Sequence, residues 1–112
     1  MMIYKIFRSN EWAELERSGT TLGAPVDLAD GYIHFSTAAQ AHETAAKHFA
    51  GVEGLVLAAV ETDPLLADLR WEPSRGGALF PHLYRALARA EVLWAVPLPL
   101  DAAGHVFPEN LQ

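Results

Sequence analysis

Short runs of apolar residues, separated by turn-forming residues, dominate the pattern along the chain and predict mainly β-strands. The first, at residues 2–7, is rich in β-branched and aromatic residues, which favour an extended backbone. Residues 55–60 and 92–98 form two more apolar strands, and we expect shorter strands or extended segments at 31–35, 69–72 and 80–84. The run at 55–60 is continuously apolar, as expected for a strand that is covered on both faces. The run at 80–84 must start extended, because Phe80 precedes a proline.

The first helical segment follows the N-terminal strand. Ser9 or Asn10 can cap its start, and Gly19 is a residue that typically ends a helix. The next stretch, residues 20–30, is rich in glycine, proline and aspartate, and we expect it to be a loop with turns.

The second helical segment starts at Thr37, which has Gln40 three residues later as its capping-box partner. It should run to about Ala50 and end at Gly51. Both main helices come early, and most later strands follow one another without a helical crossover. This order favours an α+β fold with mixed or antiparallel sheets over a doubly wound parallel sheet.

Composition and charge narrow the class of protein. The 112 residues fit one domain, 1–112, with 51% hydrophobic and 20% charged residues, as in a folded globular chain. The absence of cysteine excludes disulfides, thiolate metal sites and cysteine nucleophiles. The formal net charge of −6 argues against broad binding to a nucleic-acid backbone. No apolar run is long enough to span a membrane and no signal peptide is evident, so we expect a cytoplasmic protein without membrane partners.

Common motifs of phosphate and metal enzymes are missing. Neither the G-x-G-x-x-G nor the P-loop pattern occurs, and there is no G-x-S-x-G elbow. The start of an H-E-x-x-H motif at His42 fails, because Ala46 stands where the second histidine is needed. His48 lies about 240° around the helix from His42, so the two cannot share one metal. We therefore expect no metal.

The first cluster that could carry chemistry is the strand Y-I-H-F-S. Side chains alternate along a strand, so Ile33 and Phe35 should face the core. The opposite face then holds Tyr32, His34 and Ser36, a polar and aromatic combination that suits a ligand site.

This strand leads into a helix start, where backbone N–H groups favour an anion. A phosphate or carboxylate could lie near Ser36 and Thr37, with His34 below it. The alternative is purely structural: Ser36 and Thr37 cap the helix, and His34 is a hydrogen-bonded, half-buried residue.

The second cluster is the segment F-P-H-L-Y. If it is extended, Phe80, His82 and Tyr84 share one face, where a histidine between aromatic rings could hold a planar group and exchange a proton. The alternative is a core corner in which His82 and Tyr84 satisfy each other or a backbone carbonyl.

A loop upstream of this segment adds further polar groups. Glu72 supplies a carboxylate and Arg75 a guanidinium, and the two glycines that follow permit backbone shapes that bind anions or act as a hinge. An ordinary surface loop is the alternative. Together the two clusters would suit a nucleotide or a sugar phosphate.

At these residues the chain resembles a family of short bacterial proteins known as domain of unknown function 952. The resemblance covers nearly the whole chain. It rests on I-Y-K-I at 3–6, W at 12, D-G-Y-I-H-F-S-T at 30–37, Q at 40 and F-P-H-L-Y at 80–84.

The resemblance implies a fold like that of ADP-ribosyltransferases, with small, twisted, split sheets and two main helices around a cleft for a nicotinamide dinucleotide. On that reading NAD would be a substrate, and a small-molecule nucleotide is the expected partner. Such enzymes carry a histidine or arginine on an early strand, where this chain has Lys5, and often a late glutamate, for which Glu72 and Glu91 are candidates.

The site residues that follow from the clusters and the resemblance fall into two groups. The expected catalytic residues are His34, His82 and Glu72. The expected ligand-binding residues are Tyr32, Ser36, Thr37, Arg75 and Tyr84.

Three hypotheses stay open. The protein transfers or hydrolyses ADP-ribosyl groups as an enzyme. Alternatively, it is a nucleotide-binding or regulatory module that lacks this chemistry, or a subunit of an assembly whose aromatic residues form an interface.

Overall fold

A three-stranded antiparallel sheet forms the centre of the molecule. The structure is a computed structural model that describes residues 1–111, apart from the side chain of Arg75. The central sheet has the order β1-β4-β8, with β1 at Met2–Phe7, β4 at Leu55–Glu61 and β8 at Val92–Leu98. β4 lies in the middle, with Ala58 and Val60 in the core cluster on one face and Leu57 and Ala59 in that on the other, which confirms the prediction that both its faces are covered.

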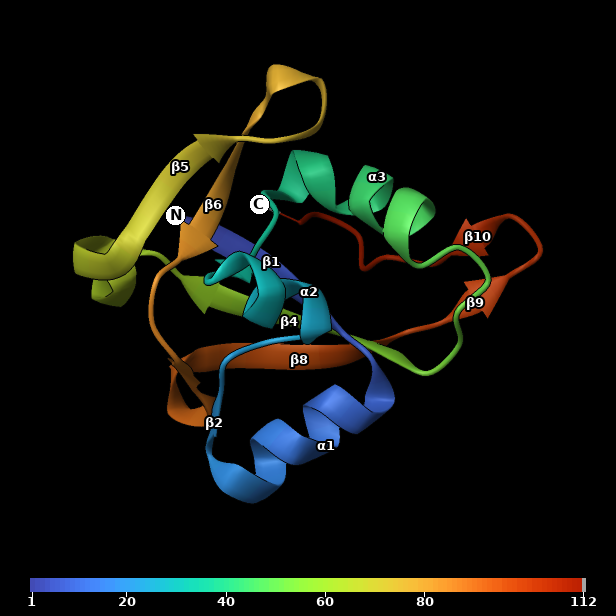
Figure 1. The fold of residues 1–112 in the computed structure, drawn as a ribbon. Coiled ribbons are helices and arrows are strands. Elements are labelled where there is room, and N and C mark those ends of the chain that lie inside the picture. The colour runs from blue at the N-terminus through green and yellow to red at the C-terminus, as the bar shows by residue number, and fades with distance from the viewer. Residues whose placement is uncertain (112) are drawn as a thin grey trace.

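A helix packs on each face of this sheet (Figure 1). On one face Ile3 and Phe7 pack with Leu15 of α1 (Ser9–Ser18). On the other face Tyr4 and Ile6 pack with Ala45 of α3 (Ala38–His48). The alternation of side chains along β1 therefore divides the core into two clusters.

A second antiparallel sheet, of order β3-β6-β5, leans against the first. It comprises β3 (Ile33–His34), β6 (Leu79–Leu83) and β5 (Leu69–Pro73). The chain just after β3 joins the two sheets: Tyr4 and Ser36 exchange backbone hydrogen bonds of 2.8 and 2.9 Å, and the N–H of Phe35 donates to the carbonyl of Pro81 at 3.0 Å.

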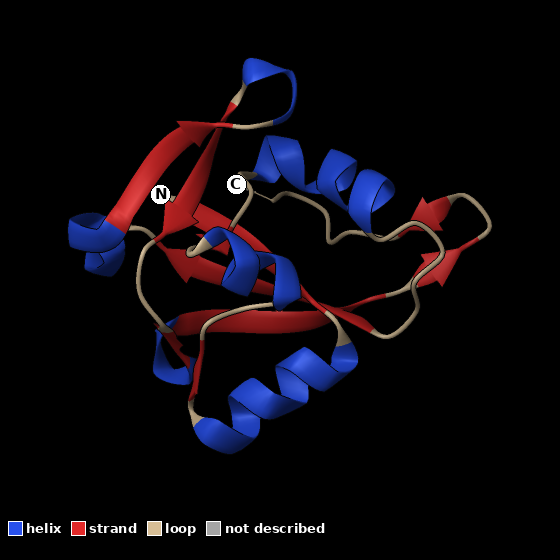
Figure 2. Cartoon of the chain, in the orientation of Figure 1, coloured by secondary structure: helices blue, strands red, loops and turns tan. Residues whose placement is uncertain are grey.

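Smaller elements complete the fold around these sheets (Figure 2). Two-stranded pairs are formed by β2 (Thr20–Thr21) with β7 (Leu87–Ala88) and by β9 (Leu100–Asp101) with β10 (Gly104–His105). The short α-helix α2 spans Pro25–Asp30. The three 3-10 turns are η1 (Asp63–Asp68), η2 (Arg75–Gly77) and η3 (Arg89–Glu91). All these pairings are antiparallel, so the α+β fold with antiparallel sheets is confirmed.

The prediction of a loop over residues 20–30 is wrong. This stretch contains β2 and the helix α2, which begins with Pro25 in the first turn. Proline is favoured there because the N–H that it lacks would have no partner in the helix. The described chain thus has a third, short helix that the sequence analysis did not predict.

Helix and strand ends also differ from the predictions. The N-cap of α1 is Arg8, whose backbone N–H donates to the Glu11 carboxylate at 2.9 Å, so neither Ser9 nor Asn10 is the cap. Gly19 ends this helix in the left-handed conformation, as predicted.

The start of α3 is as predicted, and its end is not. Thr37 and Gln40 form the capping box, with the Thr37 N–H donating to Oε1 of Gln40 at 3.0 Å and the Gln40 N–H to Oγ1 of Thr37 at 3.3 Å. The helix ends at His48, two residues earlier than expected. The strand predicted at 31–35 is shortened to the two residues of β3.

Candidate functional site

His34 and His82 lie opposite each other on neighbouring strands. The antiparallel register of β3 and β6 pairs the two residues directly, so their side chains share one face of the sheet. Their ring centroids are 5.1 Å apart, with the rings nearly edge to face. The two histidine clusters of the sequence therefore meet, as a common site requires.

Both histidines line a cleft of about 730 Å³. Its walls come from β1, α1, α2, β3, α3 and β6, and the lining includes Lys5, Arg8, Asp30, Ser36 and Phe80. A cleft of this size lies within the roughly 300–1,000 Å³ that is typical of small-molecule sites.

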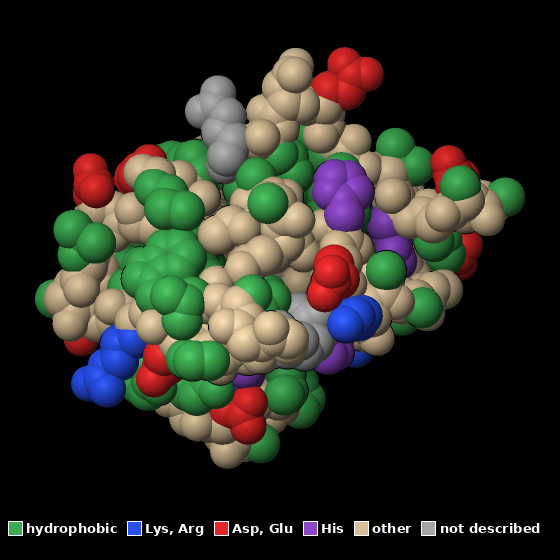
Figure 3. All heavy atoms as spheres, turned by 90° about the horizontal axis from the view of Figure 1, so that it is seen from above, with side chains coloured by type: hydrophobic (Ala, Val, Ile, Leu, Met, Phe, Trp, Pro, Cys, Tyr) green, Lys and Arg blue, Asp and Glu red, His purple; other side chains and the backbone are tan. Residues whose placement is uncertain are grey.

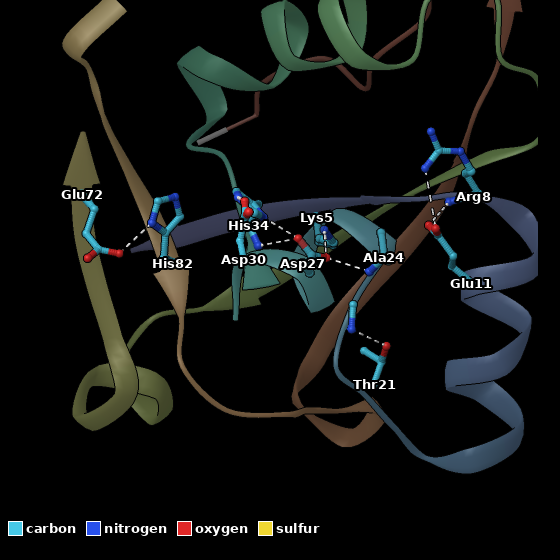
Figure 4. A network of polar contacts seen from close by, with 11 residues as sticks. Lys5, Arg8, Glu11, Thr21, Ala24, Asp27, Asp30, His34, Glu72 and His82 are labelled. Carbon is cyan, nitrogen blue, oxygen red and sulfur yellow. Dashed lines mark hydrogen bonds and ion pairs between the residues drawn. The ribbon is translucent and has the colours of Figure 1, made fainter. Parts of the chain in front are cut away.

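Asp27 of α2 forms the most enclosed part of the site (Figure 4). Its Oδ2 accepts from Nζ of the buried Lys5 at 2.8 Å and from the Ala24 N–H at 2.7 Å. Its Oδ1 accepts from the His34 N–H at 3.1 Å and faces Nδ1 of the His34 ring. Three of these contacts fix α2 to β1 and β3 through one carboxylate, and the fourth, from the Ala24 N–H, caps the start of α2.

The pKa of Asp27 reflects these contacts. Burial acts to raise it, because the charged form is desolvated. The hydrogen bond from His34, the charge and hydrogen bond of Lys5, and the Ala24 N–H outweigh burial and lower the pKa of Asp27 to about 2. Asp27 is therefore a carboxylate at neutral pH.

The other ring nitrogen of His34 also faces a carboxylate. Nε2 lies 3.0 Å from Oδ2 of Asp30, at the C-terminal end of α2. The imidazole of His34 thus bridges two acidic side chains, one buried and one 43% exposed.

His82 is held from behind by Glu72 of β5. Nδ1 of His82 donates to Oε1 of Glu72 at 2.8 Å, and the Tyr84 hydroxyl donates to the same oxygen at 2.7 Å. Both hydrogen bonds lower the pKa of Glu72, and the one from Tyr84 has the larger effect. The hydrogen bond between Tyr84 and Glu72 also raises the pKa of Tyr84. Glu72 is therefore ionised and acts as an acceptor for both neighbours.

The second nitrogen of His82 has no such partner. Among the described side chains, Nε2 of His82 is a buried polar atom without a hydrogen bond. Leaving a buried donor or acceptor unpaired costs on the order of 1–3 kcal/mol. This atom is therefore the point of the site at which a partner is most needed.

Tyr32 covers both histidines on one side. Its ring stacks on His82 at 4.2 Å between centroids and tilts against His34 at 4.7 Å and Tyr84 at 5.1 Å. Burial, followed by nearby carboxylates, raises the pKa of Tyr32, so the phenol stays neutral. Tyr32 is therefore a neutral aromatic ring that packs beside the two histidines.

The sequence-predicted residues divide by position. His34, His82 and Ser36 lie along the cleft, and the Ser36 hydroxyl is also 2.9 Å from that of Thr44. Tyr32, Glu72 and Tyr84 adjoin the histidines but are not among the residues that line the cleft.

Two of the predicted ligand-binding residues do not join this group. Thr37 caps α3 and faces a separate shallow depression beside Met1 and Glu61, so its structural interpretation agrees with the geometry. The side chain of Arg75 lies outside the described part of the chain, and its predicted role stays a prediction.

Sequence reasoning missed Asp27, Asp30 and Arg8. A signal for Asp27 was present: Lys5 stands within an otherwise apolar strand, and a buried cation needs a counter-ion. Asp30 opens the D-G-Y-I-H-F-S-T segment, four residues before His34, and α2 brings the two side chains together.

Arg8 is the cleft cation with an accessible guanidinium. Its side chain is 43% exposed, its Nη1 lies 3.6 Å from the Glu11 carboxylate, and its guanidinium carbon lies 4.8 Å above the centre of the Phe49 ring. Lys5, in contrast, is 7% exposed and fully engaged by Asp27.

On the face shown in Figure 3, Lys and Arg side chains stand singly or beside acidic ones, and hydrophobic side chains gather over one part.

Within residues 1–111, no group of three or more histidine or acidic side chains is arranged to hold a metal ion. No helix of the same residues has the length and apolar character for a membrane crossing.

These features define a class before any comparison: an α+β domain with two antiparallel main sheets and a cleft in which two histidines face each other. The chain belongs to the family described as "Protein of unknown function (DUF952)", whose model matches residues 6–95. A search of the curated proteins gives no match.

Solved structures of a similar protein have the same fold. The crystal structure of protein CC0527 from Caulobacter crescentus is 54% identical, with a TM-score of 0.89 over 94% of this chain and 92% of that one. The solution NMR structure of CC0527 is 55% identical, with a TM-score of 0.83 over 93% and 90% of the two chains.

Proposed function

We propose that the cleft binds a nucleotide of the NAD or ADP-ribose type and that the protein transfers or hydrolyses the ADP-ribosyl group. The observation that carries the proposal is the pairing of His34 with His82 in one cleft of suitable size. The choice of ligand and of reaction comes from the resemblance of the sequence to ADP-ribosyltransferases, which is an argument by analogy.

The phosphates of such a ligand need a cation, and Arg8 is the residue that supports this part of the proposal. Its guanidinium is accessible at the cleft, and a planar guanidinium binds phosphate oxygens through paired hydrogen bonds. Lys5 is a poorer candidate, because a ligand phosphate would have to compete with the buried Asp27 carboxylate.

In the hydrolytic form of the reaction, a water oxygen forms a bond to C1′ of the nicotinamide ribose. The bond from C1′ to the nicotinamide nitrogen breaks, and its electron pair stays on that nitrogen. The proton of the water passes to Nε2 of His82, which Glu72 holds from the other side. In the transferase form, an acceptor group takes the place of water.

Calorimetric titration with NAD and with ADP-ribose tests the proposal. We expect binding to the wild-type chain, weakened by about tenfold or more in His34→Ala, His82→Ala and Arg8→Gln, as for lost hydrogen bonds to charged or buried groups. His42→Ala is the matched control, because His42 lies on α3 against Phe107 and not along the cleft. Absence of binding at millimolar concentrations of both ligands would contradict the proposal.

A module that binds the nucleotide without chemistry is the second candidate. The acidic side chains at the histidines are already paired: Asp27 and Asp30 with His34, and Glu72 with His82. A carboxylate that stabilises a sugar cation would have to leave such a partner. This candidate predicts a ligand-induced rise in Tm and no release of nicotinamide over hours. Release that His82→Ala abolishes would exclude it.

A subunit of an assembly is the third candidate. Trp71, Leu79 and Tyr84 are 38%, 51% and 37% exposed, and all lie on or beside the paired strands β5 and β6. Sedimentation velocity at rising protein concentration tests this candidate, and a strict monomer would exclude self-assembly.

A further inference from the structure

We infer that Glu72 is a positioning residue that acts through His82. It fixes the proton of the His82 ring on Nδ1, so that Nε2 presents a lone pair to the ligand. The inference changes the expected role of Glu72, because the carboxylate lies behind the ring and not along the cleft. Its ligand part rests on the proposed function, and its tautomer part does not.

The tautomer follows from the chemistry of the two groups. The Glu72 oxygen is 2.8 Å from Nδ1 of His82, and an ionised carboxylate can only accept a hydrogen bond. The lowered pKa of Glu72, to which Tyr84 and His82 both contribute, keeps that carboxylate ionised at neutral pH. The proton of a neutral His82 ring therefore resides on Nδ1.

The sheet register holds this arrangement in place. β5 pairs Arg70 with His82 and Glu72 with Phe80, so Glu72 is the diagonal neighbour of His82 on the same face. The Tyr32 ring stacks on the imidazole and the Tyr84 hydroxyl donates to the Glu72 oxygen. The ring of His82 thus has a fixed orientation as well as a fixed tautomer.

The free nitrogen then decides which ligand group belongs there. In Figure 4, the second ring nitrogen of His82 points away from Glu72. A lone pair accepts from an O–H or N–H group, whereas an ionised phosphate oxygen offers no proton. We therefore expect at His82 a group that offers an O–H or N–H, which is a sugar hydroxyl, an amide or the attacking water, and the phosphates elsewhere.

His34 is not equivalent in this respect. Its two nitrogens face the carboxylates of Asp27 and Asp30, so a ligand must displace Asp30 to reach Nε2 of His34. Nε2 of His82 has no described partner, although with less than 1 Å² of surface it is reached only when a neighbouring cleft side chain moves aside. His82 is therefore the histidine whose partner the ligand must supply.

Ring-nitrogen NMR on the ligand-free protein tests the tautomer directly. We expect His82 in the Nδ1–H form in the wild-type chain, and loss of this fixed form in Glu72→Ala, because nothing else described holds the proton there. His105 is an internal control, since its Nε2–H donates to the Val52 carbonyl at 2.8 Å and should report the opposite tautomer. A wild-type His82 in the Nε2–H form would overturn the inference.

Two conservative variants separate positioning from general damage. Glu72→Gln keeps an oxygen that can accept from Nδ1, and Tyr84→Phe removes a contact that does not touch His82, so both should keep the Nδ1–H form. The other histidine signals show that each variant is folded. Loss of the tautomer in Tyr84→Phe, or its persistence in Glu72→Ala, would assign the positioning to groups other than Glu72.

Addition of ADP-ribose tests the ligand part. We expect the Nε2 resonance of His82 to shift on binding, and the affinity to fall about tenfold in Glu72→Ala but little in Glu72→Gln, as for the loss of one hydrogen bond. Binding that leaves this resonance unchanged would overturn the assigned contact. If neither ADP-ribose nor NAD binds while the tautomer is as expected, the proposed function fails and the positioning role stands.

Discussion

His34 and His82 face each other across paired strands, yet the carboxylates that hold them differ in burial and in number. His34 contacts two acidic side chains, and one of them, Asp27, has no exposed side-chain surface. His82 contacts one, Glu72, whose side chain is 34% exposed, and its second nitrogen has no described partner.

The difference separates a structural joint at His34 from a position at His82 where one ring nitrogen is unpaired. Asp27 satisfies groups on β1, on β3 and before α2, so its contacts are fully used within the fold. The Glu72–His82 pair leaves one donor or acceptor position open. A buried nitrogen that the fold leaves unpaired calls for an explanation, and a paired one does not.

Removal of the Asp27 carboxylate should give the largest loss of stability. Asp27→Ala leaves the buried ammonium of Lys5 without its counter-ion, which typically costs about 3–5 kcal/mol. Urea unfolding followed by tryptophan fluorescence measures the loss. Asp30→Ala is the control, because the Asp30 side chain is 43% exposed and should matter far less.

A double variant sharpens this prediction. Lys5→Met with Asp27→Leu replaces the pair by apolar side chains and should recover much of the lost stability, because no buried charge stays unpaired. A loss below about 1 kcal/mol in Asp27→Ala would show that the joint does not hold α2 in place.

Gly23 tests the same joint through the backbone. A Cβ added at Gly23 would lie 2.1 Å from Oδ2 of Asp27, and the φ of +98° is one that other residues rarely adopt. Strain of about 1–2 kcal/mol plus a weakened Asp27 contact of about 1 kcal/mol predicts a loss of about 2–3 kcal/mol for Gly23→Ala.

Gly31→Ala provides the matched control for that substitution. Gly31 has a similar φ of +86°, but an added Cβ would meet nothing within 4 Å. It should show the backbone strain alone. Equal losses in the two variants, measured by urea unfolding, would mean that crowding of Asp27 contributes nothing.

The acid dependence of stability should report the joint as well. Asp27 has a folded pKa of about 2 against an ordinary value of 3.8, so its contribution is complete above pH 3.8 and is lost as the pH falls towards 2. The difference corresponds to about 2 kcal/mol. Unfolding curves of the wild type and Asp27→Asn between pH 6 and pH 2 should converge by this amount; parallel curves would contradict the assignment.

The sequence could predict those features around the two histidines that depend on neighbouring residues in the chain. Strand alternation indicated that Ile33 and Phe35 are buried, and both are, at 1% and 2% exposure. The capping box at Thr37 was equally readable. Such patterns depend on neighbours in the chain, whereas the register that pairs His34 with His82 depends on contacts between distant segments.

The unpredicted part lies in α2 and its joint. A six-residue helix is too short to show a helical period of apolar residues, and Gly23, Pro25 and Asp27 are typical turn residues. Their actual roles are a close approach, a first-turn proline and a buried counter-ion. The ion pair with Lys5 joins two elements whose proximity only the fold establishes.

The smallest expected effect concerns Glu72, the partly exposed carboxylate that holds His82. Tyr84→Phe removes the hydroxyl that contributes most to lowering the pKa of Glu72. The pKa of Glu72 should therefore rise towards its ordinary range, which a carboxyl-carbon NMR titration measures. The pKa of Asp27 should not change, because its causes are burial, His34, Lys5 and Ala24.

Tyr84→Phe should thus change the pKa of one carboxylate, Glu72, and leave that of the other, Asp27, unchanged. A shift at Glu72 with none at Asp27 means that the two histidine partners are electrostatically separate, although the rings are 5.1 Å apart. A shift at both would mean that Tyr32, which contacts His34, His82 and Tyr84, transmits the change across the cleft. In that case the contacts of His34 and those of His82 would have to be treated as one coupled unit.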